Sequence, residues 1–165
     1  MSYSIVYSSR TGNTRTLAEK IRDSLPAMDC RYFGEPDGKA LTADLIFVGF
    51  WTNRGCCDDE TADFLSKLEG KKVFLFGTAG FGQEAAYFDR ILDSTEGKLA
   101  PGAQVVGRFM CQGRMPMAVR QRYEKMLDDP NPRLNLTMMI ENFDQALSHP
   151  DAEDLEHLAE AVRKF

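Results

Sequence analysis

The sequence predicts an α/β protein built on a doubly wound, five-stranded parallel sheet. Four short apolar segments rich in valine, isoleucine and phenylalanine have the length and composition of strands that are buried on both faces. Segments with a helical spacing of apolar residues alternate with them, which is typical of a parallel sheet covered by helices. The chain has 165 residues and 43% hydrophobic content, enough for one domain with a full core.

The four buried strands are expected at Ser4–Ser8, Leu45–Phe50, Val73–Gly77 and Val105–Cys111. A fifth segment, Cys30–Phe33, is more polar, so we expect it at an edge of the sheet, where one side of a strand faces solvent.

Three helices are expected between the strands, each with apolar residues on one face. The second follows an acidic turn, Asp58 to Glu60, which suits a helix N-terminus because carboxylates stabilise the positive end of the helix dipole. The apolar faces are Leu17, Ile21 and Leu25 in the first helix, Phe64, Leu65 and Leu68 in the second, and Phe88, Ile91 and Leu92 in the third.

After Cys111 the strand pattern stops and three further helices are expected, at residues 115–127, 136–147 and 151–165. The breakers "DDPNPR" (residues 128–133) and "SHP" separate them. We therefore expect a single domain over residues 1–165. Residues 1–111 form the sheet and the binding site, 112–148 an additional helical segment, and 149–165 the C-terminal helix.

Composition narrows the class of protein. Charged residues make up 27%, and no apolar run approaches the roughly 20 residues that span a bilayer. The N-terminus lacks the basic and apolar regions of a signal peptide. We expect a cytoplasmic protein that binds neither membrane nor nucleic acid.

The four cysteines show no CxxC spacing and no nearby histidine, so we expect reduced thiols and no metal site. A redox role for the adjacent pair Cys56 and Cys57 stays open, although adjacent cysteines rarely form a relaxed disulfide.

The segment after the first strand is unusually rich in hydroxyl and amide side chains around Gly12. They are Ser8, Ser9, Thr11, Asn13, Thr14 and Thr16. The carboxyl edge of an open parallel sheet is where ligands bind, and a helix N-terminus there offers free N–H groups to a phosphate. A helix cap would explain one or two of these residues. The pattern therefore predicts a phosphate-binding loop.

The stretch Ser9-Arg10-Thr11-Gly12-Asn13-Thr14 resembles the S-x-T-G-N-T phosphate loop of flavodoxins. The resemblance implies a flavodoxin-like fold with strand order 2-1-3-4-5 and one FMN bound without covalent attachment. It also implies that these six residues bind the phosphate of the cofactor.

Two further loops resemble the flavodoxin segments that flank the flavin ring. The first is Trp51, Thr52, Asn53, Arg54 and Gly55, with Trp51 in place of the proline of G-x-P-T-x-x-G. The second is Thr78, Ala79, Gly80, Phe81 and Gly82. The resemblance implies that Trp51 and Phe81 stack on the ring and that the peptide near Gly55, which tolerates positive φ, faces flavin N5.

The function that this resemblance implies is electron transfer between a reductase and a terminal redox enzyme. An FMN-dependent NAD(P)H oxidoreductase acting on a quinone or similar small acceptor is the alternative. The sequence leaves open whether the protein is an electron carrier or a stand-alone enzyme, and it favours the carrier. No side chain is assigned as a catalytic acid or base, because the flavin performs the redox chemistry. A binding module that has lost the flavin is disfavoured by the intact phosphate loop.

Other patterns exclude function classes. Gly80, Gly82 and Ala85 match a dinucleotide pattern, but no acidic residue lies about 20 positions later. The P-loop motif G-x-x-x-x-G-K-[ST] is absent, which excludes a P-loop nucleotidase.

Charge is uneven along the chain, whose net charge is −5. The segment from Arg108 to Lys125 is basic, whereas the segment from Glu141 to Glu160 contains no lysine or arginine. These are either solvated helical faces or docking surfaces. We expect Arg114, and less strongly Arg108, to attract a redox partner protein or an anionic small substrate toward the flavin. The C-terminal part, "CQG...ENFDQALSHPD", resembles small flavodoxin-like proteins of anaerobic bacteria, some associated with bilirubin reduction.

Overall fold

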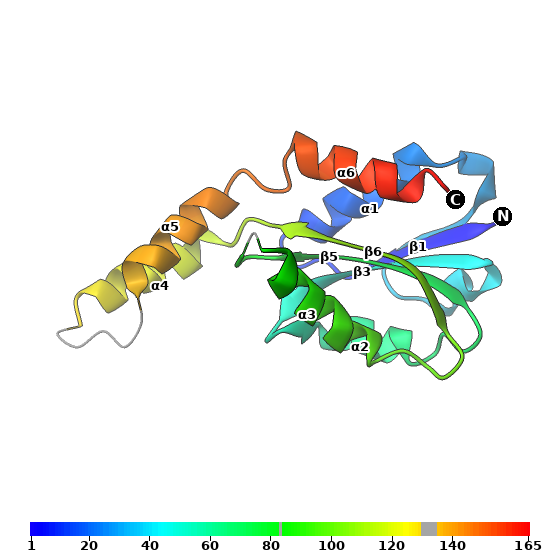
Figure 1. Ribbon diagram of the computed structural model, residues 1–165, viewed down its shortest axis with the longest axis horizontal. Helices are drawn as coiled ribbons and strands as arrows, with labels where there is room; N and C mark the ends of the chain where they lie inside the picture. The colour runs from blue at the N-terminus through cyan, green and yellow to red at the C-terminus, as the bar shows by residue number, and fades with distance from the viewer. Residues whose placement is uncertain (83, 130–134) are drawn as a thin grey trace.

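A computed structural model describes residues 1–82, 84–129 and 135–165 and contains one sheet of five parallel strands (Figure 1). The strands are β1 (Tyr3–Tyr7), β2 (Cys30–Gly34), β3 (Leu45–Asn53), β5 (Lys72–Ala79) and β6 (Gln104–Gln112). Their order is β2-β1-β3-β5-β6, which is 2-1-3-4-5 when the parallel strands alone are numbered. The predicted fold and strand order are confirmed, with the polar strand β2 at an edge.

A short sixth strand, β4 (Cys56–Cys57), is the one that sequence reasoning missed. It pairs antiparallel with the end of β3, Thr52 opposite Cys57 and Asn53 opposite Cys56. The third strand was expected to end at Phe50, but β3 continues to Asn53 because its last residues gain this partner.

Helices cover both faces of the sheet (Figure 1). On one face lie α1 (Asn13–Ser24) and α6 (Ala152–Val162), and on the other α2 (Asp59–Leu65) and α3 (Ala85–Glu96). Two short 3-10 turns, Ala27–Asp29 and Gly38–Thr42, precede β2 and β3.

The central strand β3 contributes to two separate cores. Phe47 is fully buried with the residues of α1 and α6, whereas Val48 and Phe50 are buried with those of α2 and α3. Alternate residues of a strand point to opposite faces, and both faces of this strand are apolar. This explains why the segment reads as a continuous hydrophobic run.

Glycines in the strands make room for phenylalanine rings on their neighbours. Gly77 lies opposite Phe50 in the register, and a Cβ atom on Gly77 would lie 2.4 Å from that ring. Gly49 has the same relation to Phe76. These strand glycines are therefore required by packing rather than by backbone conformation.

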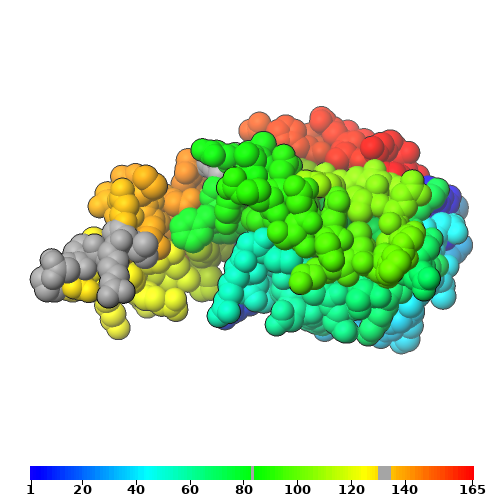
Figure 2. Space-filling view, turned by 60° about the horizontal axis from the view of Figure 1, so that its bottom comes forward, coloured from blue at the N-terminus to red at the C-terminus, as the bar shows by residue number. Residues whose placement is uncertain are grey.

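The two additional helices, α4 (Met117–Leu127) and α5 (Leu136–Ala146), form an arm beyond the carboxyl edge of the sheet (Figure 1). Figure 2 shows this arm projecting from the body of the molecule. Arg120 joins the two helices, because its Nε lies 2.8 Å from Oδ1 of Asp144. The proline-containing breaker expected between the helices falls largely on residues 130–133, which lie outside the described residues.

Within the part of the chain that the structure describes, no helix is both long and apolar enough to cross a membrane.

Candidate functional site: a cavity at the carboxyl edge of the sheet

A cavity of about 520 Å³ lies where the carboxyl ends of β3 and β5 meet the loop after β1. This is the edge at which the strand order reverses, because the chain runs from β1 outward to β2 and then back to β3. The volume is in the range of ordinary cofactor sites. The three loops singled out in the sequence all contribute to its wall.

The first loop ends at Gly12, which has φ +92° and precedes the first residue of α1. The hydroxyl oxygen of Ser9 accepts hydrogen bonds from the N–H groups of Gly12 (3.1 Å) and Arg15 (3.3 Å). The N–H groups of the first turn of a helix have no intrahelical acceptor and lie at the positive end of the dipole. Ser9 occupies two of these donors, and the remaining N–H groups at the N-terminus of α1 are the ones that a phosphate would use.

Not all polar side chains of this loop face the cavity, in contrast to the expectation from the sequence. Thr14 is 1% exposed and donates its hydroxyl proton to the carbonyl oxygen of Phe50 (3.1 Å). The hydroxyl of Thr16 donates to the carbonyl oxygen of Gly12 (2.9 Å). These two hydroxyls hold the loop in shape and are not free donors for an anion.

The second loop is a β-hairpin. Arg54 and Gly55 connect β3 to β4 and both have positive φ, 52° and 79°. Two consecutive residues with positive φ define the type I′ turn that suits two-residue hairpins. The hydroxyl of Thr52 donates to the carbonyl oxygen of Thr78 (2.8 Å), so the second loop is tied to the third.

Cys56 and Cys57 form β4 directly beside the cavity. Their sulfur atoms lie 4.0 Å apart, and both thiols are free. Burial raises the pKa of Cys57 to about 12, so this thiol is protonated at neutral pH.

The third loop is held by the arm. The carbonyl oxygen of Gly80 accepts hydrogen bonds from the side-chain amides of Asn142 (3.0 Å) on α5 and Gln112 (3.1 Å) on β6. A Cβ atom on Gly80 would lie 2.6 Å from the side chain of Met115, so a larger residue there would require the Met115 side chain to move. The arm is therefore part of the architecture of the site.

The wall of the cavity is strongly basic. Arg10, Arg54, Arg114 and Arg122 line it, and its described lining residues include no aspartate or glutamate. The guanidinium carbon of Arg10 lies 5.4 Å from the ring centroid of Trp51, within cation–π range. Neutral donors and these guanidinium groups together make a site for an anionic ligand.

Most of the residues singled out in the sequence come together here. Those lining the cavity are Arg10, Thr11, Asn13, Trp51, Thr52, Asn53, Arg54, Gly55, Thr78, Ala79, Gly80 and Phe81. Ser9, Gly12 and Thr14 are not among its lining residues, and Gly82 lines a different cavity of about 290 Å³.

Sequence reasoning missed the contribution of α3 and of the arm to the cavity. The lining residues it did not assign are Tyr87, Gly113, Met115, Pro116, Val119 and Arg122. The basic segment that follows the last strand was the sequence signal for this part of the wall, and it led to the prediction that Arg114 lies near the site.

Arg108 is not at the cavity. Its guanidinium lies 2.7 Å from Oδ1 of Asp93 and 3.1 Å from Oε1 of Glu96, both on α3. The expectation that it attracts a partner toward the flavin is wrong, because its charge is taken up within the protein.

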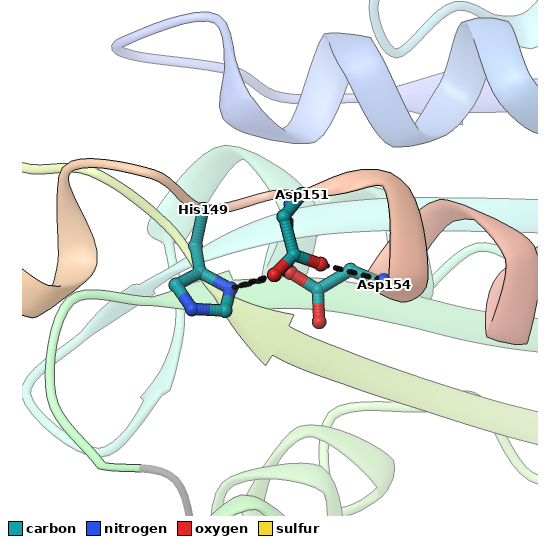
Figure 3. Close-up of side chains that lie close together, drawn as sticks. All are labelled: His149, Asp151 and Asp154. Carbon is teal, nitrogen blue, oxygen red and sulfur yellow. Dashed lines mark hydrogen bonds and ion pairs between the residues drawn. The ribbon is translucent and has the colours of Figure 1, made fainter.

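A second cluster, His149, Asp151 and Asp154, lies where α6 begins (Figure 3). Asp151 accepts a hydrogen bond from the backbone N–H of Asp154 (2.8 Å), and Asp154 accepts one from the N–H of Asp151 (2.9 Å). This is a capping box. Nδ1 of His149 lies 2.6 Å from Oδ2 of Asp154. Helix capping thus accounts for the arrangement of both carboxylates.

The fold and the cavity define a protein of the flavodoxin-like class. A family model described as a flavodoxin domain matches residues 4–163, and the chain belongs to this family.

Two curated relatives are similar over almost the whole chain, and both are named flavodoxin-like domain-containing protein BilS. The protein from Clostridium symbiosum is 39% identical, covering 94% of this chain and 90% of its own length. The protein from Clostridioides difficile is 28% identical, covering 92% and 88%. These relatives confirm the likeness to small flavodoxin-like proteins that the C-terminal sequence indicated.

Among solved structures, two-electron reduced Megasphaera elsdenii flavodoxin is similar with a TM-score of 0.52 and 21% identity, covering 99% of both chains. At this identity the likeness establishes the fold.

Proposed function

We propose that the protein is an FMN-binding electron carrier that shuttles electrons between a reductase and a terminal redox enzyme. FMN is the cofactor that membership in the flavodoxin family indicates. The observation that supports this role most strongly is the convergence of three loops on one cavity beside the N-terminus of α1.

The donor set fits FMN. The N-terminus of α1, with Ser9, Arg10 and Thr11, would hold the phosphate, because backbone N–H groups, hydroxyls and a guanidinium all favour a dianion. The side chains of Trp51 and Phe81 are available to stack on an aromatic ring, and both line the cavity.

FMN supplies the electron transfer itself, and the protein's own residues bind, orient and shield it. The hairpin at Gly55 would set the environment of one edge of the ring, because the peptides of a positive-φ turn can present either N–H or carbonyl groups there. The loop at Gly80, fixed by Asn142, would close the other side.

We further propose that residues 1–165 act as one domain in the cytoplasm, with residues 112–148 as an addition that completes the site. The arginines of the cavity wall would attract an acidic redox partner protein, or an anionic small substrate near Arg114.

Reduction kinetics separate the carrier from an NAD(P)H oxidoreductase acting on a quinone. The FMN-loaded protein is mixed anaerobically with NADH or NADPH, without any partner, and its flavin absorbance is followed. A carrier is expected to stay oxidised for minutes and to be reduced by dithionite. Rapid reduction by a nicotinamide alone, with turnover when a quinone is added, would reject the carrier in favour of the enzyme.

A further inference from the structure

One face of α4 extends from the cavity to the outside of the molecule. Val119, Arg122 and Met126 are spaced i, i+3 and i+7, so they lie along the same side of the helix. Val119 and Arg122 line the cavity, whereas Met126 lies one turn farther out and is 36% exposed. At 1.5 Å per residue, the distance from Val119 to Met126 is roughly 10 Å. We refer to Val119, Arg122 and Met126, with the flanking Lys125, as the α4 strip.

We propose that the α4 strip is the docking site for an acidic redox partner protein, which it positions beside the flavin cavity. This inference rests on the proposed carrier function and adds to it the surface and the kind of partner. A small anion would be held by the arginines of the cavity alone. A surface that continues a full helical turn outside the cavity fits a macromolecule.

The charges that favour an acidic partner are those left uncompensated within the protein. Within the described residues, Arg122 and Lys125 form no ion pair, nor do Arg54 and Arg114 at the cavity. By contrast, Arg120 on the opposite side of α4 is paired with Glu124 and Asp144. The local positive surface therefore contrasts with the net charge of −5 of the whole chain. Complementary charge speeds association and sets orientation.

The exposed methionine supplies the apolar part of the contact. Methionine is flexible and polarisable, and it adapts to irregular partner surfaces. Apolar anchors surrounded by charged groups are the usual composition of transient interfaces. The acidic residues Asp128 and Asp129 follow the end of α4.

Two redox proteins of opposite charge serve as probes: rubredoxin, which is acidic, and cytochrome c, which is basic. The FMN-loaded protein is reduced chemically and mixed with each oxidised probe in a stopped-flow instrument at several salt concentrations. Transfer to rubredoxin is expected to be slowed by salt, since the local surface is positive. Zinc-substituted rubredoxin, which carries no electrons, is titrated into the ¹⁵N-labelled protein, and backbone amide shifts are expected to cluster on the α4 strip.

The test variants are Lys125→Glu and Met126→Glu, both outside the cavity. Each has a matched control on the amino-edge side of the molecule: Lys98→Glu for charge, and Met28→Glu, at an 83% exposed methionine. The test variants should slow transfer to rubredoxin by about threefold or more and the controls by less than about twofold, within the range over which association rates vary among mutants of one interface. All four should keep the FMN affinity of the parent.

Several results would overturn the docking site. Equal effects of the test and control variants on transfer to rubredoxin would reject it. So would transfer to cytochrome c that is faster than transfer to rubredoxin and is slowed by Lys125→Glu. Amide shifts that cluster away from α4 would reject it as well. Self-association in sedimentation that Met126→Glu abolishes would assign the strip to a second copy of the chain instead. A parent protein that fails to bind FMN would reject the proposed carrier function itself, and the zinc-rubredoxin titration would still report on the docking surface.

Discussion

The side-chain amide of Asn13 donates a 2.8 Å hydrogen bond to the carbonyl oxygen of Arg114, 101 residues farther along the chain. This contact ties the proposed phosphate loop to the segment that leads into the arm. Asn13 is 6% exposed, so water does not readily replace the bond. The side chain of Asn13 therefore links the two parts of the cavity wall directly.

Removing this contact should loosen the site. Asn13→Ala leaves the part-buried carbonyl group of Arg114 without this donor, at a cost of about 1 kcal/mol. Gly113→Ala should act on the same contact, because a Cβ atom there would lie 2.5 Å from Nδ2 of Asn13. In denaturant unfolding, the effects of the two substitutions are expected to be less than additive. Full additivity would show that they act on separate interactions.

Gly12 is expected to reject larger residues through its backbone. Its φ of +92° costs a side-chain-bearing residue about 1–2 kcal/mol, while no atom beyond the adjoining residues lies within 4 Å of a Cβ placed there. Gly12→Val should give a folded apoprotein with weakened FMN binding, measured by fluorescence titration and circular dichroism. Gly12→Asn, which tolerates positive φ better, should lose less affinity. Unchanged affinity in Gly12→Val would show that the loop does not contact the phosphate.

The hairpin offers a test of charge against conformation. Arg54→Asn removes a positive charge yet suits the positive φ of 52°, and Asn-Gly is the preferred pair for a type I′ turn. Its melting temperature should match or exceed that of the parent. Gly55→Val should instead lower both the melting temperature and the fraction of protein that retains flavin. If Gly55→Val behaves as Arg54→Asn does, the turn does not impose the conformation described here.

The cap of α6 should make stability depend on pH. The backbone N–H of Asp154 hydrogen-bonds the carboxylate of Asp151 and holds its pKa below the usual value. A lowered folded-state pKa stabilises the protein above the unfolded pKa, about 3.9, and this contribution is lost as pH falls through the folded-state pKa. Asp151→Ala should therefore lower the melting temperature by a few degrees at pH 7, with a difference that shrinks below about pH 4. Asparagine can still cap the helix, so Asp151→Asn should lower the melting temperature less, and the decrease should vary little with pH. A penalty for Asp151→Ala that stays constant down to pH 3 would contradict this account.

The sheet was predictable because burial on both faces leaves a plain signature. Strands such as β3 read as continuous apolar runs, and the polar composition of β2 indicated its edge position. The hairpin escaped prediction because β4 has only two residues, Cys56 and Cys57, and its turn contains Arg54, a residue that seldom adopts positive φ.

The site was predictable where it depends on local sequence and not where it depends on tertiary contact. The polar donors of the predicted phosphate loop, Ser9 to Thr14, are consecutive in the sequence, so the sequence alone indicates them. Arg122 lines the cavity because α4 packs against the loops. The spacing of the basic residues along the helix equally suits a solvated face, so the sequence alone does not indicate this role. For the same reason, the ion pairs of Arg108 with α3 could not be read from charge patterning.

Comparison of FMN with riboflavin tests the central claim most directly, because the two ligands differ by the phosphate alone. The apoprotein is titrated with each, and quenching of flavin fluorescence is followed. FMN is expected to bind at micromolar concentration or below. Riboflavin should bind at least about tenfold more weakly, since even one charge-assisted hydrogen bond contributes about 1.5 kcal/mol. Failure to bind FMN at micromolar concentration, or equal affinity for the two ligands, would contradict a phosphate site at the N-terminus of α1.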